Sequence, residues 1–91
     1  MRHMEFGELE DVYFFDLPQG EVTLAVGHEA SPMGGNQLLL TRDGSNVHPS
    51  DLGVSGLDGL WVEGDSKAYG VPDEVADRLV EELEHLEGAL T

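Results

Sequence analysis

Three short segments of the chain are apolar at consecutive positions: 12–15, 38–40 and 60–62. A strand that is covered on one face alternates apolar and polar residues, so segments of this kind need cover on both faces. The sequence offers one amphipathic helix, and one helix covers one face of a sheet. We therefore expect either that the sheet curls and buries its own concave side, or that its second face packs on another copy or on a partner.

Turn-forming residues separate the predicted strands. Asp11–Leu17 is rich in aromatic and β-branched residues, and the Pro18-Gln19-Gly20 that follows has the composition of a tight turn. Glu21–His28 alternates apolar with small or polar residues, so these two segments should pair as a hairpin. Asp43-Gly44 favours a second hairpin turn, because both residues tolerate positive φ. The predicted strands are 11–17, 21–28, 37–42, 60–63 and 67–71, with a short return strand at 46–48 and a turn at 64–66.

The last part of the sequence predicts one amphipathic helix over 72–90. Pro72 suits the first helical position, and Asp73 and Glu74 suit the positive end of the helix dipole. Apolar residues recur at steps of three and four, as one helix face requires: Val75, Leu79, Leu83, Leu86 and Leu90. The predicted fold class is α+β, a single domain over 1–91 with a small antiparallel, partly curled sheet of four or five strands and one amphipathic C-terminal helix.

The chain is strongly acidic. Nineteen Asp and Glu residues stand against four Lys and Arg, which gives a formal charge of −15. Nucleic-acid binding depends on clustered cations that release counterions from phosphates, and four scattered cations do not provide this. The same charge disfavours binding to anionic membrane surfaces. A membrane-spanning helix needs about 20 consecutive apolar residues, and no apolar run in the sequence is that long. We therefore expect neither nucleic acid nor a membrane as a partner.

Such a charge is tolerated best in molar salt, which shortens the Debye length to about 3 Å. One Lys against eight Asp and eleven Glu resembles the composition of proteins from halophilic archaea. The N-terminal residues lack the apolar region of a signal peptide, so we expect a cytoplasmic protein. His3-Met4 is also typical of a cloning remnant; on that interpretation Met4 is the natural start and residues 1–3 carry no function, and on the alternative they are native.

The sequence contains no pattern that indicates catalysis or a metal site. The four histidines do not follow a recognised ligand spacing, and the absence of cysteine removes thiolate ligands and disulfides. The serines lie in turns rich in Gly or Pro, and no Gly-x-Ser-x-Gly motif is present. We expect no catalytic residue, no cofactor and no metal, so an enzyme is the less favoured class.

Two glycine-rich loops and the last hairpin carry residues suited to an interface. Met33 lies at the tip of the loop 30–36, and Leu57 lies in the loop 53–59. Trp61 and Tyr69 are expected to face each other across the last hairpin, although Trp61 also suits the core. Aromatic residues and Met are enriched in interface cores. The predicted interaction residues are Met33, Leu57, Leu60, Trp61 and Tyr69.

The main functional hypothesis is a non-enzymatic module of a halophile-type cytoplasm. It would bind a protein partner or form a homodimer through the apolar sheet face and the two loops. The alternative is a small-molecule-binding or catalytic domain with a pocket between the loops 30–36 and 53–59, with His28, His48 or Asp51 as polar groups. A third hypothesis is an acidic decoy, in which carboxylates of the helix stand in for nucleic-acid phosphates.

Overall fold

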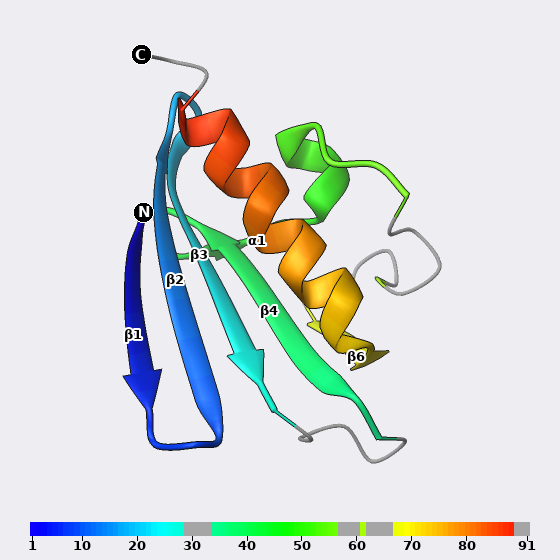
Figure 1. The fold of residues 1–91 in the computed structure, drawn as a ribbon. Coiled ribbons are helices and arrows are strands. Elements are labelled where there is room, and N and C mark those ends of the chain that lie inside the picture. Colours follow the sequence, from blue (N-terminus) through cyan, green and yellow to red (C-terminus); the bar gives the residue numbers. More distant parts are fainter. Residues whose placement is uncertain (29–33, 57–60, 62–66, 89–91) are drawn as a thin grey trace.

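The computed structural model describes residues 1–28, 34–56, 61 and 67–88. Within these residues, six strands form one antiparallel sheet, and one α-helix lies across one of its faces (Figure 1). The elements in chain order are β1 (Arg2–Phe6), β2 (Glu10–Leu17), β3 (Gly20–Gly27), β4 (Asn36–Arg42), β5 (Ser45–Asn46), the 3₁₀ helix η1 (Pro49–Leu52), β6 (Lys67–Val71) and α1 (Asp73–Gly88). The predicted α+β class, with its antiparallel sheet and C-terminal helix, is confirmed.

The sheet runs in the order β1, β2, β3, β4, and both β5 and β6 pair with the outer edge of β4. The hairpin of β2 and β3 is in register from Glu10, opposite Gly27, to Leu17, opposite Gly20. This confirms the pairing predicted from the turn residues and the alternation. A bulge interrupts the register between β4 and β6, beside Leu38.

Two tight turns at one end of the sheet, the one before Gly20 and the one at Asp43-Gly44, are in contact with each other. Asp43 and Gly44 both have positive φ, 48° and 84°, as a type I′ hairpin turn requires. The Asp43 carboxylate accepts a hydrogen bond of 3.0 Å from the backbone N–H of Glu21. Gly20 has φ 134°, and a Cβ there would lie 2.2 Å from Asp43 Oδ2, so only glycine fits.

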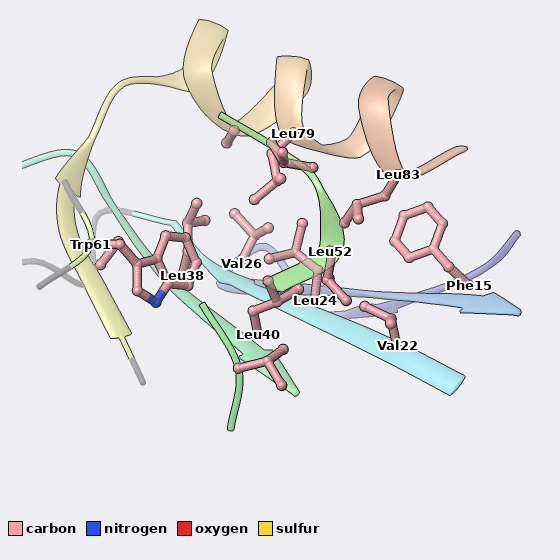
Figure 2. Close-up of a cluster of buried hydrophobic side chains, with 14 of the residues drawn as sticks. Phe15, Val22, Leu24, Val26, Leu38, Leu40, Leu52, Trp61, Leu79 and Leu83 are labelled. Atoms are coloured by element: carbon pink, nitrogen blue, oxygen red, sulfur yellow. The ribbon is translucent and has the colours of Figure 1, made fainter. Parts of the chain in front are cut away.

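The hydrophobic core lies between the sheet and α1 (Figure 2). Alternate residues of β3 and β4 point into it, and the helix contributes Ala76, Leu79 and Leu83. Leu52 of η1 belongs to the same cluster, so η1 closes the core on the same side of the sheet. The buried cluster consists of Phe15, Leu17, Val22, Leu24, Val26, Leu38, Leu40, Val47, Leu52, Val54, Trp61, Ala68, Val71, Ala76, Leu79 and Leu83.

The structure departs from the sequence-based expectations mainly at the N-terminus. β1 was not among the predicted strands, yet it pairs with β2 over its whole length, from Arg2 opposite Phe14 to Phe6 opposite Glu10. All of its residues are exposed, so it lacks the alternation of a half-buried strand. An exposed edge strand therefore leaves little signal in the sequence.

The remaining differences are small. The helix starts at Asp73 and is described as far as Gly88, close to the predicted 72–90. The predicted short return is β5, at Ser45–Asn46. Of the predicted strand 60–63 only Trp61 is described, and it forms an isolated antiparallel bridge with Ala68. The predicted turn at 64–66 lies outside the described residues.

Candidate functional site

The strand register places one row of paired residues on the side of the sheet away from α1. The row crosses β1 to β4 and consists of Met4, Val12, Ala25 and Leu39, with Lys67 of β6 at its end. We call the side of the sheet that carries this row the far face. Val12 is buried but lies outside the core cluster, as expected for a residue on the far face.

Aromatic residues extend this apolar row. Phe14 is half-buried beneath the guanidinium of Arg2, whose Cζ lies 5.1 Å from the ring centroid. Met4 and Phe6 each remain 51% exposed. Within the described residues no helix covers the far face, because α1 and η1 both contribute to the core on the opposite side. Among the described residues, the far face therefore has an apolar row that no helix covers, flanked by polar and charged side chains.

The far face is nearly neutral although the chain is strongly acidic. Among the residues that the structure describes, it carries two cations, Arg2 and Lys67, and three carboxylates near strand ends, Glu10, Asp16 and Glu21, so these formal charges sum to −1. The Arg2 Nη2 lies 3.6 Å from Glu21 Oε2. In contrast, α1 carries seven carboxylates and one arginine. Most carboxylates of the described residues therefore lie away from the far face.

The helix side of β1 and β2 holds a second group of side chains, which we call the histidine cluster: His3, Glu5, Asp11 and His28. His3 Nε2 lies 2.8 Å from Asp11 Oδ1, and His28 Nε2 is hydrogen-bonded to Asp11 Oδ2. The backbone N–H of His28 donates a hydrogen bond of 2.8 Å to the carbonyl of Leu9. This bond holds the backbone of His28 next to the start of β2. One carboxylate therefore engages two imidazoles.

The hydrogen bond between Asp11 and His28 dominates the electrostatics of the cluster. It lowers the pKa of Asp11, and the bond of Asp11 to His3 lowers it further. The same bond to Asp11 raises the pKa of His28, with smaller contributions from Asn36 and Asp73. Burial and the neighbouring carboxylates raise the pKa of the Tyr13 hydroxyl. The folded protein therefore favours the ion pair of a charged His28 and a charged Asp11.

A cavity of about 240 Å³ adjoins the cluster between the sheet and the first half of α1. His28 and Asn36 line its sheet side, and Asp73 and Asp77 line its helix side. Asn36 is buried, and its Nδ2 donates to the Val71 carbonyl at 3.0 Å and to Asp73 Oδ1 at 2.7 Å. These bonds join β4 to the end of β6 and the first turn of α1.

The polar residues suggested for a pocket have separate surroundings. His48 is the N-cap of η1 and accepts a hydrogen bond from the backbone of Ser50, while Asp51 accepts one from the backbone of His48. Both side chains therefore form the capping box of η1. A cavity of about 520 Å³ includes Gly53–Ser55, and residues of α1 complete it, among them His85. Parts of both loops lie outside the described residues, namely 30–33 of the loop 30–36 and 57–59 of the loop 53–59.

The predicted interaction residues separate into three groups. Met33, Leu57 and Leu60 lie outside the described residues. Trp61 is 2% exposed, so its described position is in the core. Tyr69 is 43% exposed and alternates with buried Ala68 along β6, which adds it to the far face. The expected pairing of Trp61 with Tyr69 is wrong, because Trp61 pairs with Ala68.

Sequence reasoning did not identify the histidine cluster, because its members come from three elements. His3 and Glu5 alternate along β1, Asp11 lies opposite Glu5 on β2, and His28 follows β3. The pattern His3-x-Glu5 was the available signal, since residues two apart in a strand share one face. It did not enter the predictions, because the sequence leaves open whether residues 1–3 are native or a cloning remnant.

No family model, curated protein or solved structure matches this chain. Among the described residues, no helix combines the length and the apolar character needed to cross a bilayer. The function of the chain is therefore inferred from its own residues.

Proposed function

We propose that this chain is a non-enzymatic self-association module of a halophile-type cytoplasm, in which the far face of one copy packs on the far face of a second. The single observation that carries this proposal is that the described residues of the far face form an almost neutral surface with an uncovered apolar row, on a chain of formal charge −15. An acidic surface keeps such a chain apart from other molecules, so the area with the fewest carboxylates is where contact costs least. Its central row supplies the apolar contact: Met4, Val12, Ala25 and Leu39.

Charge favours a second copy as the occupant. Because the described residues of each far face have formal charges that sum to −1, two copies meet with little repulsion across the interface. A strongly cationic partner would be attracted to the carboxylates of α1 instead. Arg2 is exposed and already lies near Glu21 of the same chain. In the proposed dimer it can pair in the same way with a far-face carboxylate of the second copy.

The size of the far face suits a reversible dimer. Four strands about 4.8 Å apart and up to eight residues long at about 3.4 Å per residue span about 500 Å² in projection. Two copies then bury about 1,000 Å², the lower limit of specific interfaces. Two sheets packed in this way form a sandwich with strands within about 30° of each other.

Sedimentation velocity over a series of KCl concentrations tests this function. The two copies repel through their total charge, and raising KCl from 0.1 M to 2 M shortens the Debye length from about 10 Å to about 2 Å. We therefore expect the dimer to tighten as salt rises. A monomer at every salt and at millimolar protein concentration overturns the proposal.

Two matched variants locate the interface. Phe6→Glu adds a charge to the far face at a side chain that is 51% exposed, so the monomer should fold and the dimer should be lost. Leu9→Glu makes a similar change outside the strands, at a side chain that is 75% exposed, and should leave the dimer intact. Equal effects of the two variants would place the interface elsewhere.

A further inference from the structure

The hairpin of β1 and β2 brings three metal-ligating side chains to one place. The imidazole of His3 and the carboxylates of Glu5 and Asp11 each offer a ligand atom, and these atoms all lie within 4.8 Å of one another. His3 and Glu5 share a face of β1, and Asp11 is the direct partner of Glu5 on β2. The convergence is therefore a consequence of strand register and not of an isolated side-chain position.

Other side chains hold two of these ligands in orientation. The ring of His3 stacks on the ring of Tyr13, with centroids 4.3 Å apart and planes 3° from parallel. His28 is hydrogen-bonded to Asp11 Oδ2, which leaves Asp11 Oδ1 beside His3 Nε2 at 2.8 Å. Metal sites commonly have such outer residues, which fix the direction of a ligand and strengthen it.

We propose that His3, Glu5 and Asp11 bind a divalent transition-metal ion, with Zn²⁺ as the best match. Zinc accepts imidazole nitrogen and carboxylate oxygen at about 2.0 to 2.2 Å, which places neighbouring ligand atoms about 3.3 Å apart in a tetrahedron. The distance of 2.8 Å between His3 Nε2 and Asp11 Oδ1 needs only a small expansion to admit the ion. On binding, the ion takes the place of the proton between these two atoms, and that proton leaves to solvent.

The donor set selects the class of ion. An imidazole favours zinc and its neighbours in the transition series over Mg²⁺ and Ca²⁺, which prefer oxygen ligands only. Three protein ligands leave one tetrahedral position for water. His3 has 32% of its side chain exposed and Asp11 has 19%, so the ion can enter from solvent.

The test uses the full chain without an affinity tag, in 2 M KCl with excess Mg²⁺ to occupy non-specific carboxylates. Calorimetric titration with Zn²⁺ should show one equivalent, and Co²⁺ should give the visible absorption of a tetrahedral site. His3→Gln and Asp11→Asn should each weaken Zn²⁺ binding at least tenfold. His28→Gln should weaken it less, since His28 acts through Asp11. His85→Gln is the matched control on α1 and should bind as the unchanged protein does.

A readout on the unchanged protein guards against variants that fail to fold. In nitrogen-15 imidazole spectra, Zn²⁺ should shift the Nε2 signal of His3 and leave those of His48 and His85 in place. The proposal is overturned if no stoichiometric Zn²⁺ binding occurs, or if binding persists in both His3→Gln and Asp11→Asn. Zinc shifts confined to His85 would overturn it equally, because they would place the ion among the carboxylates of α1.

Discussion

The two faces of the sheet are built from the same strands but differ in cover and in charge. The side under α1 is a closed aliphatic core, and the outside of that helix carries most of its seven carboxylates. The far face is also apolar along its central row, yet in the described part of the chain no helix covers it and its formal charges sum to −1. In a chain this acidic, a surface with few carboxylates is more informative than one with many, because carboxylates are abundant in the chain.

Three consecutive leucines give the sharpest test of this comparison. Leu38 and Leu40 point into the core, and Leu39 lies on the far face. Leu40→Ala should lower the free energy of unfolding by about 2 to 5 kcal/mol, because it leaves a cavity in a packed interior. Leu39→Ala should lower the free energy of unfolding of the monomer by less than half as much, and it should also weaken the dimer. Denaturant unfolding at low protein concentration in 2 M KCl measures both, and equal losses would show that the two faces are equally covered.

A buried amide gives the next largest effect. Asn36 is the one buried polar residue among the described positions, and it joins β4 to the start of α1 through two hydrogen bonds. Asn36→Ala leaves the Val71 carbonyl and the Asp73 carboxylate without this donor, and should cost about 1 to 3 kcal/mol of stability. The control is Gln37→Ala, on the far face of the same strand. It should change the free energy of unfolding by no more than about 0.5 kcal/mol. The same unfolding measurement decides between them.

The centre of the far face should control association without controlling folding. Ala25 is half-buried in the apolar row, and Ala25→Glu places a charge opposite a second copy. We expect the dimer dissociation constant to rise at least tenfold, or about 1.4 kcal/mol. Sedimentation equilibrium in 2 M KCl measures it. A variant that unfolds would show instead that the centre of the far face already serves as a core of the monomer.

The smallest effect concerns pH, with a chelator present to remove metal ions. Asp11, Asn36 and Asp73 face His28 and raise its pKa above the ordinary 6.5. A raised pKa means that the contribution of His28 to stability is fully present below pH 6.5 and is lost as pH rises through the folded value. Thermal unfolding between pH 6 and 9 should therefore show a stability loss that is absent in His28→Gln. The Asp11 contribution has the opposite sense: its pKa lies below 3.8, so this contribution is present above that pH and disappears as pH falls.

Local patterns in the sequence were sufficient for the elements that have a buried face or a constrained turn. The alternation in 21–28 predicted β3, Asp43-Gly44 predicted a hairpin turn, and the apolar stripe predicted α1. Each of these signals depends on residues within a few positions of one another. β1 lacked such a signal, because an exposed edge strand has no apolar periodicity.

The sequence alone determined that the chain has more apolar strand surface than one helix can cover, that its fold is α+β, and that its surface is anionic. Only the tertiary structure decided which residues share the uncovered face and that His3, Glu5 and Asp11 meet. The physical reason is register: side chains alternate across a strand with period two, so a shift of one residue in pairing would exchange the two faces. Pairing between strands distant in sequence is set by packing of the whole core, and no local pattern contains it.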